Sequence, residues 1–138
     1  LEVIIENISD EVIIFDKSGN YNTLNKTTRD NAIYDIDSTK NINDFSKLNI
    51  LYDMNGNLIP LENTLANRVI RGEIIKDANI IRKKNNINQI REVNGTPIYD
   101  GEGNFKFGVL ISRDINERLK KEENIFIKKQ YETLYNHR

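Results

Sequence analysis

The fold of this protein is decided by residues 105–118, which read FKFGVLISRDINER. The first part alternates with a period of two, which is typical of a β-strand: Phe105, Phe107, Val109 and Ile111 form one set, and Lys106, Gly108, Leu110 and Ser112 form the other. From Asp114 onward the pattern is helical and highly charged. Asp114 followed three residues later by Glu117 resembles a capping box with aspartate as the cap. The stretch therefore predicts a long strand that passes directly into an exit helix.

Two more long strands are predicted upstream, over residues 74–81 and 87–98. The turns between the three strands contain Lys84-Asn85-Asn86 and Asp100-Gly101-Glu102-Gly103. Short connections of this kind indicate antiparallel neighbours. Pro97 cannot donate a hydrogen bond to a neighbouring strand, so we expect it at a strand end or an edge position.

The first half of the chain combines a hairpin with short helices. Residues 12–15 and 21–24 are predicted strands, separated by the turn Asp16-Lys17-Ser18-Gly19. Asn25 is a good N-cap for a helical turn through Asp30. Short helical turns are predicted around Ile33, Ile36, Phe45, Leu48 and Leu51, and Asp53-Met54-Asn55-Gly56 is another turn.

A longer helix is predicted between Pro60 in its first turn and Gly72 just past its end. Its apolar face would carry Leu61, Leu65, Val69 and Ile70. Residues 1–8 have apolar residues at helical spacing and predict a short amphipathic helix. The resulting order of helices and strands predicts an α+β domain with an antiparallel sheet.

Composition excludes several kinds of site. The chain has 138 residues, no cysteine and a single histidine, His137. Disulfides, cysteine-ligated metals and cysteine nucleophiles are therefore excluded, and one histidine near the end cannot build a catalytic triad or a multi-histidine metal site in the folded body. We expect no catalytic residue and no metal site. The net charge of -1 gives no electrostatic reason to expect nucleic acid or an anionic membrane as a partner.

The sequence also predicts a location. No apolar run is long enough to span a membrane, and no positively charged start precedes an apolar core, as a signal peptide requires. Position 1 is leucine, which indicates a piece cut from a larger protein. We therefore expect a cytoplasmic segment without membrane contact.

Three stretches, in this order and spacing, resemble the PAS (sensory box) family over nearly the whole chain. They are NISDEVIIFD at 7–16 with Gly19 and Asn25; DMNG at 53–56 with Ile59-Pro60 and RVIRGE at 68–73; and GTPI at 95–98 with Asp100, Gly103, Gly108 and RDINER at 113–118. The last stretch looks like the exit motif D-I-T of the family, followed by E-R. Asn116 stands where threonine is usual, so the hydroxyl contact of that position is missing.

The resemblance implies a five-stranded antiparallel sheet in the order 2-1-5-4-3 with helices on one face. It implies an N-terminal flanking helix at 1–10, a PAS core at 11–114 and a C-terminal signalling helix at 115–138. It also implies a sensory or protein-interaction role, dimerisation through flanking helices, and in many members a small ligand between the helices and the sheet.

Two sets of residues are candidates for this role. Signal transfer is expected at Asp114, Ile115 and Asn116, because a change in strand pairing must rotate or shift the helix that follows. The alternative, purely structural interpretation of the same residues is helix capping. A candidate ligand pocket would be lined by Asn25, Phe45, Leu65, Val69 and Ile70. An ordinary packed core is the alternative for each of these residues.

The sequence does not identify a cofactor, but it argues against two classes of cofactor. Light-oxygen-voltage flavin photochemistry needs a cysteine, and the chain has none. Histidine-ligated haem needs an imidazole in the helix before Gly72, and none is there. A noncovalent flavin, a carboxylate metabolite and no ligand at all remain as alternatives.

We therefore predict a non-catalytic sensory and dimerisation module that works beside neighbouring domains, first of all those of a sensor histidine kinase. A diguanylate cyclase or a transcription regulator is the alternative parent. A ligand-free dimerisation scaffold and a small α+β enzyme are the alternative functions, although the sequence offers no recognisable catalytic constellation.

Overall fold

The computed structural model describes residues 9–32, 40–44, 50–84 and 86–136. The predicted N-terminal helix lies outside these residues, as do Ile33, Ile36, Phe45 and Leu48. The first strands are β1 (Glu11–Phe15) and β2 (Tyr21–Leu24), followed by α2 (Lys26–Asn31) and β3 (Ile50–Tyr52). The 3-10 turn η2 (Leu61–Asn63), α4 (Leu65–Ile70), β4 (Ile75–Lys84), β5 (Ile87–Tyr99), β6 (Phe105–Asp114) and α5 (Asn116–Asn136) complete the chain.

The strands form one antiparallel sheet in the order β2-β1-β6-β5-β4-β3. The five predicted strands and their predicted order are confirmed, and the structure adds β3 at one edge. Leu51 was expected in a helical turn, and that prediction is wrong. Residues 50–52 are extended because they pair with residues 81–83 of β4, a contact that lies far away in sequence.

The helix predicted between Pro60 and Gly72 is broken into two pieces. Thr64 has an extended backbone with ψ 153, which separates η2 from α4. The Thr64 hydroxyl oxygen accepts a hydrogen bond from the backbone N–H of Asn67, so the cap of α4 is Thr64. Leu65 and Val69 of the predicted apolar face are buried and Ile70 is half-buried, whereas Leu61 is exposed.

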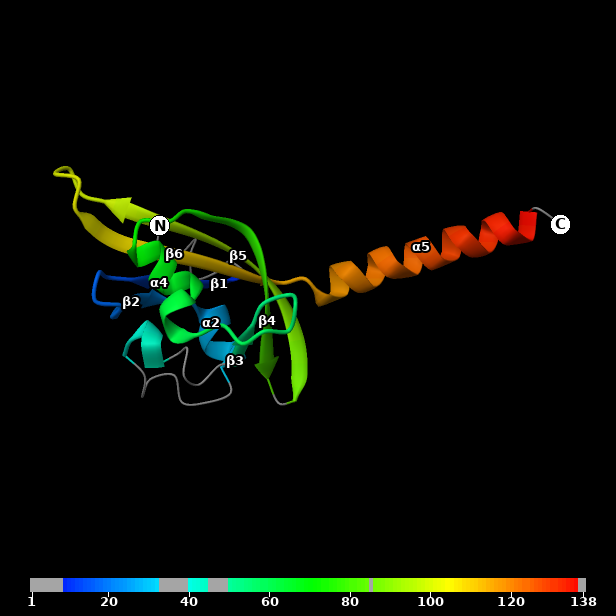
Figure 1. Cartoon of the computed structure of the whole chain (residues 1–138), viewed down its shortest axis with the longest axis horizontal. Coiled ribbons are helices and arrows are strands. Elements are labelled where there is room, and N and C mark those ends of the chain that lie inside the picture. Colours follow the sequence, from blue (N-terminus) through cyan, green and yellow to red (C-terminus); the bar gives the residue numbers. More distant parts are fainter. Residues whose placement is uncertain (1–8, 33–39, 45–49, 85, 137–138) are drawn as a thin grey trace.

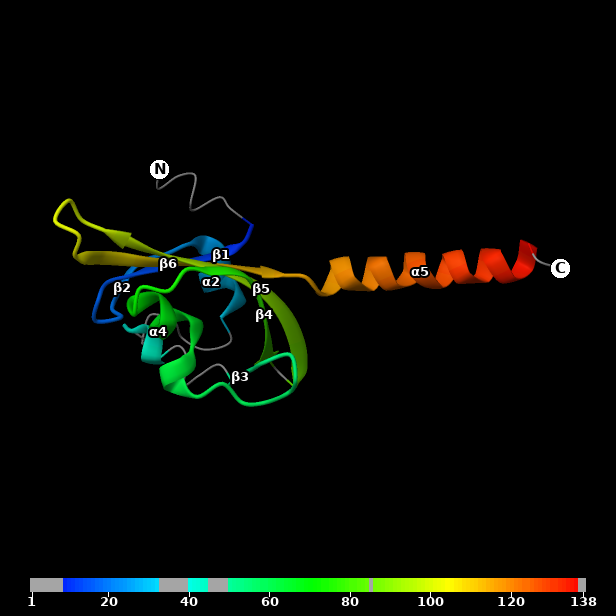
Figure 2. The same cartoon turned by 45° about the horizontal axis from the view of Figure 1, so that its top comes forward.

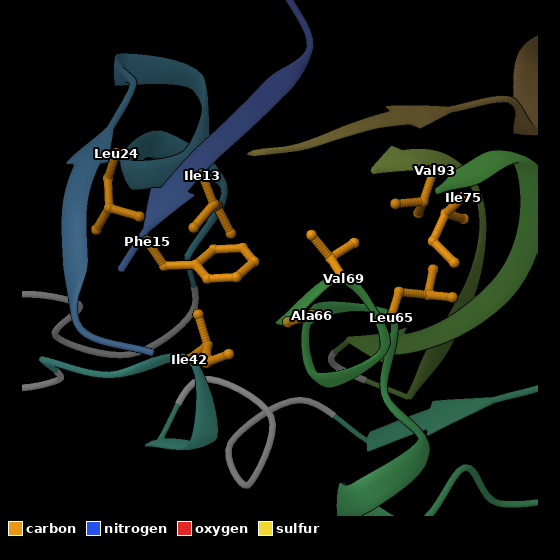
Figure 3. Packing of buried hydrophobic residues seen from close by; sticks show 9 residues of the cluster. All are labelled: Ile13, Phe15, Leu24, Ile42, Leu65, Ala66, Val69, Ile75 and Val93. Atoms are coloured by element: carbon orange, nitrogen blue, oxygen red, sulfur yellow. The ribbon is translucent and has the colours of Figure 1, made fainter. Parts of the chain in front are cut away.

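The hydrophobic core lies between the sheet and α4 (Figure 2). Side chains from β1, α4, β5 and the turn at 42–44 meet there, as Figure 3 shows. Gly108 of β6 makes this approach close, because a Cβ atom at that position would lie 2.5 Å from Phe15 Cζ. Gly95 of β5 has a similar role, since its Cβ would lie 2.7 Å from Val69 Cγ2. The backbone at these glycines therefore serves as a packing surface.

The final helix leaves the body of the domain. β6 runs to Asp114, α5 begins at Asn116, and α5 projects away from the sheet in both views (Figures 1 and 2). At 1.5 Å per residue a helix of 21 residues extends for about 30 Å. The predicted strand-to-helix transition is confirmed.

Candidate functional site

A cavity of about 80 Å³ lies between the sheet and α4. Most of its wall is apolar, and charged side chains occupy one part. The described residues that line it are Glu11, Ile13, Ile42, Leu51, Ile59, Thr64, Leu65, Ala66, Ile80, Arg82, Arg91, Val93, Leu110 and Ser112. The long strands, α4 and the edge strand β3 thus all contribute to one partly open cavity.

The charged part of the wall is a buried cluster of Glu11, Arg82 and Arg91, which are 3%, 6% and 3% exposed. Both terminal guanidinium nitrogens of Arg82 donate to the Glu11 carboxylate, at 2.9 Å from Nη1 to Oε1 and 2.8 Å from Nη2 to Oε2. Arg91 Nη2 lies 2.6 Å from the same Oε2. This geometry is the bidentate pairing that suits guanidinium and carboxylate groups.

Neighbouring strands hold both arginines in place. Arg91 donates from Nε to the Ser112 hydroxyl at 2.9 Å and from Nη2 to the Ser112 carbonyl at 3.0 Å. Arg82 donates from Nη2 to the Gln89 side-chain oxygen at 3.1 Å. The cluster therefore links β1, β4, β5 and β6.

The cluster controls the charge state of Glu11. Burial by itself raises the pKa of the Glu11 carboxyl, but the hydrogen bonds and positive charges of Arg82, and the charge of Arg91, outweigh burial and hold the pKa below its usual value. Burial lowers the pKa of Arg91, and the charge of Glu11 acts against that shift. Glu11 is thus ionised, and its carboxylate is shared by two guanidinium groups.

The pattern of the strands contains a signal for this cluster that sequence reasoning missed. Glu11 precedes the core residues Ile13 and Phe15 with a period of two, and Arg91 precedes Val93 in the same way. Charged residues in phase with buried apolar residues point into the same space.

The predicted pocket residues have different places in the structure. Leu65 lines the cavity, whereas Asn25, Val69 and Ile70 are not among its lining residues, and Phe45 lies outside the described residues. Val69 is fully buried against Gly95 and Gly108. Asn25 is fully buried as the cap of α2, where its side-chain oxygen accepts a hydrogen bond from the Thr28 backbone N–H.

The predicted signal-transfer residues form a compact junction with β5. The Asn116 side-chain oxygen accepts a hydrogen bond of 2.6 Å from the Ile90 backbone N–H, and the Ile115 backbone N–H donates to the Ile90 carbonyl at 3.1 Å. Asp114 accepts from the Asn116 backbone N–H at 2.9 Å, and the Ile115 side chain is 2% exposed. The start of α5 is therefore attached to Ile90 of β5 by two hydrogen bonds, and Asn116 Nδ2 also donates to the Asn88 carbonyl of β5 at 3.5 Å.

The junction and the cavity share one short stretch of β5. Arg91, which lines the cavity, directly follows Ile90, which holds the start of α5. Arg91 also lies opposite Asp114 in the pairing of β5 with β6. Residues directly opposite in an antiparallel pair have Cβ atoms about 5 Å apart. The cavity wall and the junction are therefore one residue apart along β5.

The described residues were compared with the requirements of a metal site and of a membrane span. They contain no group of three or more histidine, cysteine, aspartate or glutamate side chains that could hold a metal ion. Within the same part of the chain, no helix combines the length and apolar character needed to cross a bilayer.

Comparison with solved structures shows the fold. The PAS domain of an HTR-like protein from Haloarcula marismortui matches with a TM-score of 0.53 and 19% identity over 83% of this chain and 88% of its own. A PAS domain from a two-component sensor histidine kinase matches with a TM-score of 0.53 and 12% identity over 82% of this chain and 91% of its own. An RNA-binding light-oxygen-voltage receptor matches with a TM-score of 0.62 and 12% identity over 99% of this chain and 38% of its own.

Sequence comparison adds no relative. No family model matches the chain, and no protein of curated function matches it. The structural likeness establishes that this chain has the PAS fold.

Proposed function

We propose that this PAS-fold chain is a non-catalytic sensory module that converts a change in its core into a movement of α5. The observation that carries the proposal is the junction, where Ile90 of β5 bonds to both Ile115 and Asn116 while the adjacent Arg91 lines the cavity. Because β6 becomes α5 across one residue, a shift in the pairing of β5 with β6 changes the direction or rotation of the helix.

The proposed mechanism is an equilibrium between two arrangements of the junction. In one arrangement Asn116 holds the start of α5 on β5, as in the structure described above. In the other the hydrogen bonds to Ile90 are broken or exchanged. A signal changes the populations only by binding the two arrangements unequally. The cavity is where such a difference in affinity would arise.

The proposed output passes through a homodimer formed by α5. Apolar side chains are exposed along this helix, including Ile125, Phe126, Ile127 and Tyr131. A projecting helix with exposed apolar residues favours pairing with a second helix of the same kind. No strict heptad runs through the helix, so the pairing would be a short or irregular coiled coil.

The proposed parent is a cytoplasmic sensor histidine kinase, and the neighbouring domains would receive the movement of α5. Support comes from the structural likeness to a PAS domain of a two-component sensor histidine kinase, together with the projecting exit helix. A rotation or shift of paired helices is a signal that a kinase domain attached to them can read.

Replacement of Asn116 tests the proposal. In the parent kinase, Asn116→Ala should change autophosphorylation or its regulation by about fivefold, because the loss of the hydrogen bond to Ile90, worth about 1 kcal/mol, changes a two-state ratio by about that factor. Asn124→Ala is the matched control, since Asn124 is exposed farther along the same helix. Unchanged kinase output and regulation in a folded Asn116→Ala protein would show that the junction has no signalling role.

A further inference from the structure

We infer that the cavity binds a short-chain monocarboxylate, with its carboxylate on the Glu11–Arg82–Arg91 cluster and its apolar tail against α4 and the sheet. The claim that binding of this acid is the sensory event rests on the proposed function. The binding itself is argued from the charge, size and wall of the cavity.

The charge of the cavity wall is unbalanced. Among the described residues that line it, two arginines face one glutamate, which leaves one positive charge in excess. All three side chains are nearly buried, and a buried charge is costly unless a partner of opposite sign compensates it. The bonds of Arg91 to Ser112 and Glu11 involve its Nε and Nη2 atoms.

Two carboxylates near Arg91 lie outside the cavity wall. Asp10 pairs with Arg113 at 3.1 Å, and the Asp114 carboxylate accepts the Asn116 backbone N–H. Burial has the largest effect on the pKa of Arg91 and lowers it. The charges of Asp10 and Asp114 raise this pKa, but the net shift is downward. Their charges therefore compensate Arg91 only partly, and an anion inside the cavity would complete the compensation.

The volume limits the size of the anion. Pockets for drug-sized ligands usually measure roughly 300–1,000 Å³, so a cavity of about 80 Å³ favours a much smaller molecule. A short acid such as propionate or butyrate fits this limit. A long fatty acid or a flavin does not.

The rest of the wall determines the tail of the ligand. Apart from the cluster, Ser112 and Thr64, the lining side chains are aliphatic, and they include Leu65, Ile80 and Val93. An aliphatic chain of two or three carbons would be in contact with these groups. A dicarboxylate would place its second charge against them without a partner, which is unfavourable.

The position of Arg91 gives the bound acid a route to the junction. Arg91 lies opposite Asp114 in the pairing of β5 with β6, and its neighbour Ile90 bonds to Ile115 and Asn116. A carboxylate bound to Arg91 would weaken the attraction of Arg91 for Asp114 at the end of β6. The acid would therefore act on the start of α5 through one residue of β5.

Titration calorimetry of the 138-residue chain tests the inference, with sodium butyrate compared with butyramide at constant ionic strength. We expect butyrate to bind with a Kd on the order of 1 mM or lower, as the size of the ligand allows. Butyramide has the same shape without the charge, and we expect it to bind at least about tenfold more weakly. Octanoate should bind more weakly than butyrate because it exceeds the space.

Arg91→Gln should weaken butyrate binding by at least about tenfold. Arg113→Gln is the matched control, since Arg113 is largely exposed, lies outside the cavity wall and should leave the affinity within about twofold. If Arg91→Gln fails to fold, the comparison of butyrate with butyramide in the unmodified chain decides the question by itself.

The inference is overturned if butyrate shows no saturable binding up to about 10 mM, or if butyramide binds equally well. The Asn116→Ala experiment separates this failure from failure of the proposed function. Altered kinase output without butyrate binding would keep the sensory role and reject this ligand. Butyrate binding without any effect of Asn116→Ala would keep the binding site and reject the junction.

Discussion

At the residue scale, Glu11 is the group on which the buried arginines depend. Its carboxylate binds Arg82 through two hydrogen bonds and Arg91 through a contact of 2.6 Å. The three side chains come from β1, β4 and β5, so one carboxylate holds three strands together. Removal of one partner from a buried ion pair costs more than the pair itself contributes, because a charge is left buried alone.

Glu11→Gln should lower the free energy of unfolding by about 3–5 kcal/mol at pH 7. The folded pKa of Glu11 lies below the unfolded value, so its stabilising effect is complete above the unfolded pKa of about 4.3 and is lost as pH falls through the folded pKa. The difference between wild type and mutant should therefore shrink below about pH 4. Urea denaturation from pH 7 to pH 3 measures it. Glu62→Gln, at an exposed position, is the control, and equal effects of the two changes would reject this role of Glu11.

Gly108→Ala tests the close packing of β6 against the core. A Cβ atom there would lie 2.5 Å from Phe15 Cζ and 3.1 Å from Val69 Cγ1, so the neighbouring side chains would have to move. We expect a loss of about 1–3 kcal/mol in thermal or urea unfolding. Gly101→Ala is the control, since no atom lies within 4 Å of a Cβ at that position. A Gly108→Ala protein as stable as the control would show that the side chains around Gly108 move aside at little cost in free energy.

At the element scale, the turns are the most regular local feature of the chain. Asp16, Asp53 and Asp100 each accept two hydrogen bonds of 2.9 Å from backbone N–H groups two and four residues later. In each turn the glycine three residues after the aspartate has φ +84, a conformation that favours glycine. The same four-residue pattern thus reverses the chain three times.

The helix α2 is attached to β1 through Asn25. The Asn25 side-chain oxygen accepts from the backbone N–H groups of Val12 and Thr28, both at 3.1 Å, and its Nδ2 donates to the Asp10 carbonyl at 2.8 Å. One buried side chain therefore caps a helix and extends the hydrogen bonding of a strand.

Asn25→Ala should lower the free energy of unfolding by about 1–3 kcal/mol, because the Val12 and Thr28 amides would be left buried without an acceptor. Hydrogen exchange should be faster in the mutant than in the wild type at the Val12 amide of β1 and the Thr28 amide of α2. Asn55→Ala, in an exposed turn, should change stability by no more than about 0.5 kcal/mol. Unchanged protection of the Val12 amide in the Asn25→Ala protein would contradict this assignment.

At the scale of the whole molecule, a small sheet domain carries a long helix that extends away from it (Figure 1). The described side chains of α5 are exposed, among them Ile127 at 54% and Tyr131 at 67%. Apolar groups in this position are exposed in the described part of the molecule. A second copy of the helix would cover them.

Ile127→Lys should raise the dissociation constant of the dimer by at least about tenfold, because a charge would replace an apolar contact between two helices. Analytical ultracentrifugation or native mass spectrometry measures the change. Glu132→Lys introduces the same side chain at an exposed polar position of α5 and serves as the control. A monomeric wild-type chain, or equal effects of the two variants, would reject dimerisation through this face of α5.

The amino-acid sequence by itself determined the strands, the turns and the exit helix. Period-two patterns, Asp-x-x-Gly turns and the Asn25 cap depend on contacts between near neighbours, so they can be read without knowledge of the fold. The resemblance to PAS proteins supplied the order of the strands, which local patterns do not contain. The location of the junction at 114–116 followed from the same local change of period.

Only the tertiary structure decided where the cavity lies and what lines it. Glu11, Arg82 and Arg91 are separated by up to 80 residues in the chain, and they meet because β1, β6, β5 and β4 are adjacent in the sheet. The edge strand β3 and the break at Thr64 also depend on partners that are distant in sequence. Burial of charge is favourable only where an opposite charge lies within reach, and that distance is a property of the folded chain.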